Sequence, residues 1–305
     1  MTQALPLPDS FTRSRSLHNA TARFTNKLVM ALCFVSAFLA IGALFLILGY
    51  VLYKGFANLD LALFTNLPRD HPAGLRNAIA GTMTLILMAS CLGVPLGMAC
   101  GTYLAEFAAD TWFSHGIRLV IDVLAGVPSI IVGILAYELV AVRTGSSSAY
   151  AGAVALGFMM CPIISKTTEE MLRLVPKALR EASIGLGASK FQTLVRVVIP
   201  AASAGIITGI MLAVARVAGE TAPLLFTVGD SSLPIYSCNS HFPFLHADLA
   251  HPFPSLTVKI FIYSGMIDDR WSYQAWSGML ILITLVLALN ICVRIASNRR
   301  KFNAA

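Results

Sequence analysis

Charged residues are scarce in this sequence. They make up 12% of the 305 residues, whereas an ordinary soluble domain carries about 25%. Hydrophobic residues make up 57%, and the mean hydropathy is +0.75. This composition excludes an ordinary soluble protein and predicts an integral membrane protein. The net charge of +7 does not indicate nucleic-acid binding, because the basic residues lie beside apolar runs and not along one basic face.

The compact motifs of several enzyme classes are missing. Neither HExxH nor GxSxG occurs, which excludes the zinc proteases and serine hydrolases that depend on them. A Walker A loop is also absent, since residues 185–190 lack its Gly-Lys-Ser/Thr ending. We therefore expect no enzyme activity, and no nucleotide or other cofactor bound by this chain.

Cysteine and histidine are few, and their spacing does not indicate a metal site. Five of the six cysteines lie in apolar runs, and Cys238 has no partner in its expected external loop. His241, His246 and His251 recur in steps of five beside Asp248, and such steps do not share a helical face. We expect no metal there and interpret the segment as an irregular external loop that contacts a partner.

Six apolar runs occupy most of the chain. A membrane-spanning helix needs about 20 predominantly apolar residues, and we expect such helices at about 28–53, 78–104, 117–142, 150–164, 201–228 and 275–295. The result is an all-α membrane protein with four regions. These are a disordered, polar cytoplasmic tail (1–27), the first helix with an external loop (28–74), a core of five helices (75–295) and a basic cytoplasmic tail (296–305). The first run is too long for a signal-peptide core, so we expect it to be retained.

Glycines recur at four-residue intervals in two of these runs. Gly93, Gly97 and Gly101 form one series, and Gly205 and Gly209 form another. In a soluble helix each glycine costs about 1 kcal/mol relative to alanine. In a bilayer the same spacing lets helices approach closely, so we expect two helix-packing faces.

The basic residues predict the orientation in the membrane. With the N-terminus inside, fifteen Lys and Arg residues fall in cytoplasmic segments and six in external ones, while Arg216 lies within the membrane. By the positive-inside rule, both termini and the charged segment between the fourth and fifth runs are cytoplasmic.

That charged segment has a helix–elbow–helix pattern. Glu181-Ala182-Ser183 belongs to a first short helix, and glycines at 185 and 187 favour a turn. A second helix follows, which we expect to end at Pro200. The spacing Glu-Ala-Ser, three residues, Gly, nine residues, Val-x-Ile-Pro resembles the EAA loop of ABC-transporter permeases, with small departures at Ser183, Val197 and Ile199.

The resemblance to the EAA loop implies a separate ATP-binding subunit that docks on residues 168–198 and itself binds ATP and magnesium. The implied coupling residues are Glu181, Ala182, Ser183, Gly187 and Pro200. The alternative is a solvated charged loop without a partner.

A second segment makes the resemblance specific to one family of these permeases. Residues 216–227 read Arg-Val-Ala-Gly-Glu-Thr-Ala-Pro-Leu-Leu-Phe-Thr and closely resemble the fifth span of the PstA family of phosphate-transporter permeases. The sister PstC family resembles the segment less, because it usually lacks Ala-Pro-Leu-Leu. Segments at 77–82, 101–106, 122–130 and 167–171 agree, so the resemblance covers about residues 75–290.

This resemblance implies the fold of a type I ABC importer permease, with six transmembrane helices and a cytoplasmic coupling-helix loop. It implies import of inorganic phosphate across the bacterial inner membrane with a PstC-like permease, a PstB-like ATPase dimer and an external PstS-like phosphate-binding protein. A permease for another oxyanion, such as sulfate or molybdate, is an alternative within this class. A non-transport integral-membrane enzyme or scaffold is the alternative outside it.

Candidate pathway residues are Arg216, Glu220, Thr221 and Asp122. A charge near the bilayer centre costs about 2.5 to 3.5 kcal/mol on insertion scales, and Arg216 and Glu220, four residues apart, can pair. Either this pair is structural, or Arg216 binds the passing anion while Glu220 limits how tightly it is held. A proline just beyond Thr221 is expected to loosen the helix. Asp122 lies one turn inside the third span, where it can contact water or Arg118.

Overall fold

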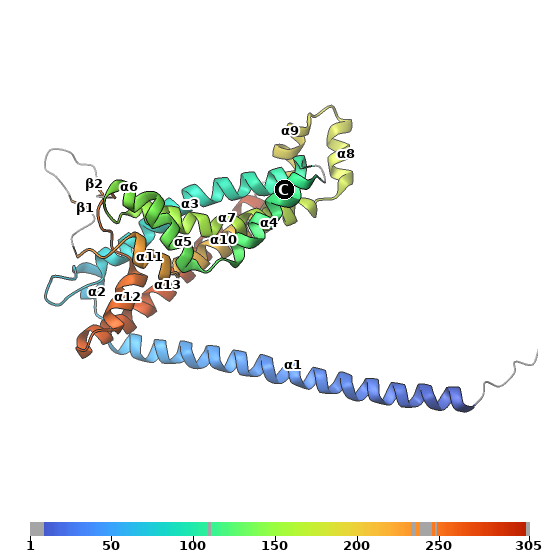
Figure 1. The fold of residues 1–305 in the computed structure, drawn as a ribbon, viewed down its shortest axis with the longest axis horizontal. Helices are drawn as coiled ribbons and strands as arrows, with labels where there is room; N and C mark the ends of the chain where they lie inside the picture. The colour runs from blue at the N-terminus through green and yellow to red at the C-terminus, as the bar shows by residue number, and fades with distance from the viewer. Residues whose placement is uncertain (1–8, 109–110, 233–235, 238–245, 248, 303–305) are drawn as a thin grey trace, which may run out of the picture. The chain divides into compact units, whose positions relative to one another are not determined.

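The computed structural model describes residues 9–108, 111–232, 236–237, 246–247 and 249–302 (Figure 1). The chain divides into two compact units, residues 1–54 and 55–305. The sequence predictions for Cys238, His241 and Asp248 fall outside the described residues.

The described part of the first unit is a single helix. α1 spans Asp9–Ala57, and from Ala22 onward it is long and apolar enough to cross a membrane. The expectation of a disordered tail over residues 1–27 was wrong from Asp9 on. Residues 9–27 contain neither glycine nor proline, so nothing in this polar segment stops a helix that has already formed in the apolar run beyond it.

The second unit is a bundle of helices. Its elements are α2 (Ala62–Thr65), α3 (Arg76–Thr102), η1 (Tyr103–Phe107), α4 (Trp112–Gly126), α5 (Ser129–Ala136), η2 (Tyr137–Ala141), α6 (Val142–Thr144), α7 (Ala149–Arg173), α8 (Lys177–Gly185), α9 (Lys190–Thr193), η3 (Leu194–Val198), α10 (Ile199–Ala218), α11 (Ala222–Thr227), α12 (Leu256–Ser264) and α13 (Asp269–Phe302). The η elements are π-helical turns. Two antiparallel two-residue strands, β1 (Tyr236–Ser237) and β2 (His246–Ala247), are the exception to the predicted all-α class.

Five helical segments among the described residues are long and apolar enough to cross a membrane. They are Ala22–Ala57, Arg76–Phe107, Ala149–Arg173, Lys190–Ala218 and Asp269–Ile295. A sixth candidate is a bent pair, Trp112–Gly126 and Ser129–Thr144, whose axes differ by 103°. The continuous third span expected at 117–142 is therefore broken. Pro128 lacks an N–H, and it holds the preceding Val127 in an extended conformation (ψ 132°).

The expected fourth span was too short at its C-terminal end. It was placed at about 150–164, but α7 continues to Arg173. The added turns bury Ser165, Thr168 and Leu172 against neighbouring elements. Tertiary contacts that a hydropathy pattern does not reveal therefore stabilise this polar end of the helix.

The first glycine series packs α3 directly on α7. A Cβ at Gly93 would lie 2.9 Å from the Gly157 carbonyl oxygen, and one at Gly101 would lie 2.4 Å from the Ser165 carbonyl oxygen. Positions further along α3 thus meet positions further along α7, so the two helices run parallel. The prediction of a packing face at this glycine series is confirmed.

The second glycine series packs α10 on α7 from another side. A Cβ at Gly205 would approach the side chain of Met171, and one at Gly209 would approach that of Thr167. The later glycine of α10 meets the earlier residue of α7, so the two helices run antiparallel. The central helix α7 is therefore enclosed by α3 and α10, and the second predicted packing face is also confirmed.

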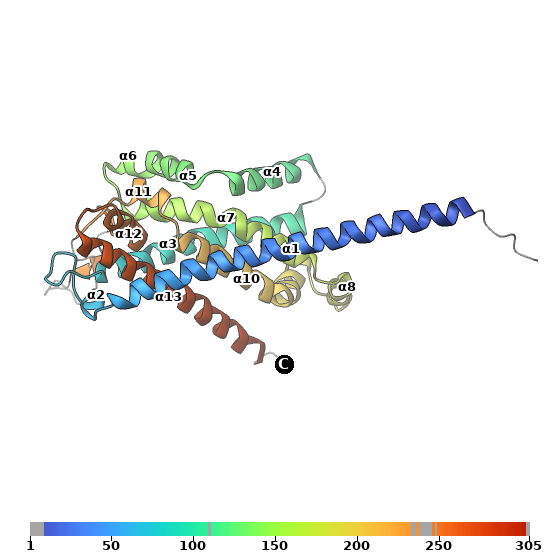
Figure 2. The same ribbon diagram turned by 90° about the horizontal axis from the view of Figure 1, so that it is seen from below.

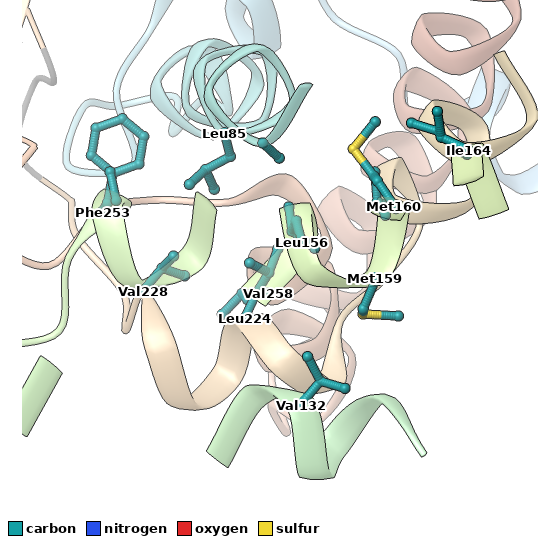
Figure 3. Packing of buried hydrophobic residues seen from close by; sticks show 14 residues of the cluster. Leu85, Val132, Leu156, Met159, Met160, Ile164, Leu224, Val228, Phe253 and Val258 are labelled. Atoms are coloured by element: carbon teal, nitrogen blue, oxygen red, sulfur yellow. The ribbon is translucent and has the colours of Figure 1, made fainter. Parts of the chain in front are cut away.

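The main hydrophobic core lies around α7 (Figure 3). Leu156 and Met160 of α7, Leu85 of α3, Val132 of α5 and Leu224 of α11 belong to one buried cluster. The short helices α5 and α11 also contact each other closely, because a Cβ at Gly133 would lie only 2.5 Å from the Cα of Pro223. The core therefore includes both helices that begin after a break in a span.

A helix occupies the region expected to be a long loop between the fifth and sixth spans. α12 is largely buried, and it contacts α13 and α3. The Leu256 amide at its start donates to the buried Thr82 hydroxyl of α3 at 2.8 Å. α12 has nine residues and is too short for a membrane span, so the hydropathy pattern did not distinguish it from the loop around it.

Candidate functional site

The helix–elbow–helix pattern forms a compact projection, which we call the knob (residues 177–193). α8 ends in a tight turn in which Gly187 has a φ of +90°, and its amide donates to the Ile184 carbonyl oxygen at 2.9 Å. Glycine adopts this left-handed conformation without a steric penalty. α9 then begins at a capping box in which Ser189 and Gln192 each bond the other's backbone N–H. The predicted elbow is confirmed.

The knob carries large apolar side chains that are exposed. Leu186 is 90% exposed and Phe191 is 67% exposed. Glu181 and Ala182 are exposed beside them, while Ser183 is turned inward and shares a 3.0 Å hydrogen bond with Thr193. An exposed apolar group rimmed by polar residues is typical of a protein–protein interface.

The second helix of the knob does not end at Pro200. α9 continues through the π-helical turn η3 into α10, and Pro200 lies in the first turn of α10. In η3 the Ile199 amide reaches back five residues to Leu194. This wider turn tolerates a proline, which has no N–H to donate. The expected helix end was wrong, and the knob is joined to α10 by continuous helix.

The base of the knob packs on the end of α7. Leu194 and Val198 of η3 are buried with Leu172 and Val175 in a separate apolar cluster. Both the knob and the N-terminal end of α4 lie at the end of the bundle opposite α6 and α12 (Figures 1 and 2).

Asp122 does not pair with Arg118. It accepts a 3.0 Å bond from Lys166 of α7, whereas Arg118 donates to Glu169 at 2.9 Å. Glu169 also pairs with Arg173 at 2.8 Å. The predicted pairing of Asp122 with Arg118, four residues earlier, was therefore wrong. The neighbouring helix α7 supplies a basic partner for Asp122 and an acidic partner for Arg118. The sequence could not reveal that proximity.

The fifth span ends earlier than expected. α10 stops at Ala218 instead of continuing to 228, and Gly219 to Thr221 form a break before α11. Pro223 lies in the first turn of α11, where its fixed φ favours a helix start and its missing N–H is not needed. The end of α10 therefore presents Arg216, Glu220 and Thr221 close together at a helix break.

Arg216 and Glu220 form a loose pair. Arg216 Nε lies 3.8 Å from Glu220 Oε1, which is too long for a hydrogen bond, and the two side chains are 54% and 20% exposed. Glu220 is held by the backbone turn, since its amide donates to the Val217 carbonyl oxygen at 3.2 Å. Because the pair is not hydrogen-bonded and the Arg216 side chain is half-exposed, the guanidinium donors are not used up by Glu220.

The four predicted pathway residues do not form one cluster. Asp122 lines a cavity of about 310 Å³ with Arg118, Lys166, Glu169, Glu170 and Arg173, and the lining includes none of the three residues at the α10 break. Asp122 therefore belongs to an ionic contact between α4 and α7.

The expected external loop contains a buried ion pair that the sequence did not predict. Lys259 Nζ of α12 lies 2.7 Å from Asp230 Oδ2, and the lysine side chain is 3% exposed. Lys259 also lies 5.6 Å from the ring centroid of Tyr263, whose pKa is raised to about 12 by burial and, secondarily, by Asp230. Asp230 lies three residues beyond the end of α11, so this pair fixes the exit of α11 on α12.

The described residues contain no group of three His, Cys, Asp or Glu side chains that could hold a metal ion. His246 lies in β2, and His251 lies near the start of α12, in irregular structure.

Comparison with known proteins identifies the family. Residues 93–301 match the family model described as binding-protein-dependent transport system inner membrane component. Phosphate transport system permease protein PstA of Yersinia pestis is 38% identical over 291 residues, covering 94% of this chain and 95% of that protein. The PstA protein of Haemophilus influenzae is 36% identical, with 90% and 95% covered. This chain belongs to the PstA permease family.

Membership settles several predictions. The permease is a multi-pass component of the inner membrane and a non-catalytic subunit of a transport system, as the missing enzyme motifs predicted. Its helical fold is similar to that of a chain of the inward-facing MetNI methionine ABC transporter. The TM-score is 0.53 at 18% identity, and the match covers 81% of this chain and 100% of that chain. The likeness at that identity concerns the fold alone.

Proposed function

We propose that this permease forms half of the membrane pathway of an ATP-driven importer of inorganic phosphate. The relatives named above are phosphate transport system permeases, and the match covers nearly their whole length. This favours phosphate over sulfate or molybdate. The observation within the chain that carries the proposal is the half-exposed Arg216 at the α10 break, restrained only loosely by Glu220.

Arg216 suits a transported anion. A guanidinium presents several N–H donors in a planar fork that matches phosphate oxygens. A nearby carboxylate offsets part of the positive charge, so the site releases what it binds. Thr221 adds a hydroxyl at the same break, which can donate to an oxyanion.

A six-span topology is supported by the direction of two helices. α3 and α7 pack in parallel along their glycine contacts, and two parallel spans must be joined by a segment that crosses back. The bent pair α4–α6 is that segment, and in both views it runs from the α8 end of the bundle to the α12 end (Figures 1 and 2). Six crossings with both termini in the cytoplasm agree with the excess of basic residues there.

The knob is the proposed contact for the ATPase. Glu181 and Ala182, with the exposed Leu186 and Phe191, form its outer surface, and Gly187 fixes the angle between its two helices. The full assembly would comprise this chain, a PstC-like permease, a PstB-like ATPase dimer that binds ATP and magnesium, and a PstS-like phosphate-binding protein outside.

The proposal is tested by uptake into membrane vesicles from cells with and without this chain, supplied with labelled phosphate, sulfate or molybdate in parallel. ATP-dependent phosphate uptake that needs this chain, without uptake of the other two anions, is the expected result. Uptake of sulfate or molybdate in place of phosphate would assign the permease to another substrate.

A further inference from the structure

One partly buried ion pair joins the knob to the helix bundle. Arg180 Nη1 of α8 donates to both carboxylate oxygens of Glu106, and Arg180 Nη2 donates to the Leu172 carbonyl oxygen at 2.6 Å. The side chains of Arg180 and Glu106 are only 21% and 16% exposed. A single guanidinium therefore connects α8 with η1, at the end of α3, and with the end of α7.

The π-helical turn η1 places Glu106 for this contact. The Ala108 amide reaches back five residues to the Tyr103 carbonyl oxygen, at 2.8 Å. The widened turn leaves the Leu104 carbonyl oxygen to accept from the guanidinium groups of Arg118 and Arg173, each at 3.5 Å. π-helical turns are frequent at functional sites, and this one directs three arginines toward the end of α3.

α8 also contacts η3 and α9, but it buries no side chain against the bundle. A cavity of about 170 Å³ lies beside the ion pair, lined in part by Phe107, Ile184 and Leu194. Apart from Arg180, the Ser183 hydroxyl joins α8 to Thr193, which belongs to the knob itself. The apolar cluster at the base of the knob contains residues of η3 and α7 but none of α8. Residues 174–176 join α8 to α7 along the chain, and Arg180 adds the side-chain hydrogen bonds that tie α8 to both η1 and the end of α7.

We propose that Arg180 is a positioning residue that transmits movement of the knob to α3 and α7. This rests on the proposed function, in which an ATPase moves the knob. The guanidinium holds η1 and α7 at once, and α3 and α7 are already in backbone contact along their glycines. A displacement of α8 therefore moves both helices together. Lysine cannot replace arginine here, because an ammonium lacks the planar fork that bonds Glu106 and Leu172 simultaneously.

The first experiment measures the link itself. Amide hydrogen exchange of the purified complex in lipid nanodiscs is compared for wild type, Glu106→Gln, Arg180→Lys and a control, Arg143→Gln, which removes an exposed charge outside the knob. Amides of residues 177–185 should exchange at least about tenfold faster in Glu106→Gln and Arg180→Lys than in wild type, because charge-assisted bonds are lost. The control should match wild type. Unchanged exchange in both Glu106→Gln and Arg180→Lys would overturn the proposal.

The second experiment measures coupling. Phosphate uptake and ATP hydrolysis are recorded on the same proteoliposomes, and their ratio should fall at least about tenfold in Glu106→Gln and Arg180→Lys but not in Arg143→Gln. A double variant, Glu106→Gln with Arg180→Lys, should have a ratio no lower than that of either single variant. Each single change already breaks the same link, so the two effects should not add. A normal ratio despite faster exchange of α8 would show that the pair is only structural and would overturn the proposal. Failure of the proposed function is separate, because it appears as absent phosphate uptake with the wild-type chain.

Discussion

Gly187 shows how one residue sets the shape of the knob. Its φ of +90° places it in the left-handed region, and no atom lies within 4 Å of a Cβ built there. Any penalty for a larger residue therefore comes from the backbone conformation and not from crowding. The glycine at 185, two residues earlier, also has open space but no positive φ.

These two glycines give a matched prediction. Gly187→Leu should cost about 1–2 kcal/mol in the elbow conformation, misdirect α9, and abolish uptake and retention of the ATPase while membrane insertion stays normal. Gly185→Leu should be tolerated for folding of the elbow. Co-purification of the ATPase and phosphate uptake measure both effects. Normal uptake by Gly187→Leu would refute the role of the knob in coupling.

The buried pair of Asp230 and Lys259 carries a second prediction at this scale. Asp230→Ala leaves a lysine of 3% exposure without its carboxylate, which should cost about 3–5 kcal/mol of stability. Replacing both residues, with Lys259→Met, removes the uncompensated charge and should recover most of that loss. Thermal unfolding of the purified permease in detergent measures both variants. If Asp230→Ala is as stable as wild type, the pair contributes nothing to stability.

At the scale of elements, two helix contacts organise the bundle, and both depend on glycine. α3 meets α7 through Gly93, Gly97 and Gly101, and α10 meets α7 through Gly205 and Gly209. Within a bilayer the attraction between helices comes from close packing and not from burial of apolar surface away from water. Small residues are therefore required at these positions.

This gives a prediction with an internal control. A Cβ at Gly101 would lie 2.4 Å from the Ser165 carbonyl oxygen, whereas one at Gly116 in α4 meets nothing within 4 Å. Gly101→Ala should separate α3 from α7 and lower the thermal unfolding temperature and the membrane level of the protein. Gly116→Ala should be neutral or slightly stabilising, by up to about 1 kcal/mol. If both changes have the same effect, close packing at Gly101 is not important.

The sequence predicted those elements whose determinants are local. Apolar runs located the long helices, and the glycine spacing located the packing faces. Glycines 185 and 187 located the elbow. Polar contacts between elements were not predictable, because Lys166 is 44 residues from Asp122 and Arg180 is 74 residues from Glu106.

The same limit explains the errors in element boundaries. α12 is a nine-residue helix stabilised by burial against α3 and α13, and no amphipathic period of useful length marks it. The break after Ala218 depends on Gly219 and on the packing of α11 against α5, which hydropathy does not report. In contrast, the end of α4 and the start of α5, which lie on either side of Pro128, could have been predicted from the proline alone.

At the scale of the whole molecule, the proposed topology predicts which positions water-soluble reagents reach from outside. In a variant without native cysteines, Ser264→Cys should be labelled by an impermeant thiol reagent in intact cells, and Leu186→Cys should not. Both positions are exposed, so a difference reports sidedness. Labelling of Leu186→Cys in intact cells would reverse the orientation and remove the ATPase contact.

The central claim is that phosphate crosses the membrane past Arg216. Uptake of labelled phosphate by proteoliposomes with the complete transporter, made with Arg216→Gln alone or with Glu220→Gln, tests it most directly. Loss of a charge-assisted contact to the anion predicts at least about a tenfold fall in uptake with Arg216→Gln. Protein level and ATPase association should be normal, and uptake should be equally low in the double variant. Uptake restored in the double variant would contradict this account, because it would show that the two charges only neutralise each other.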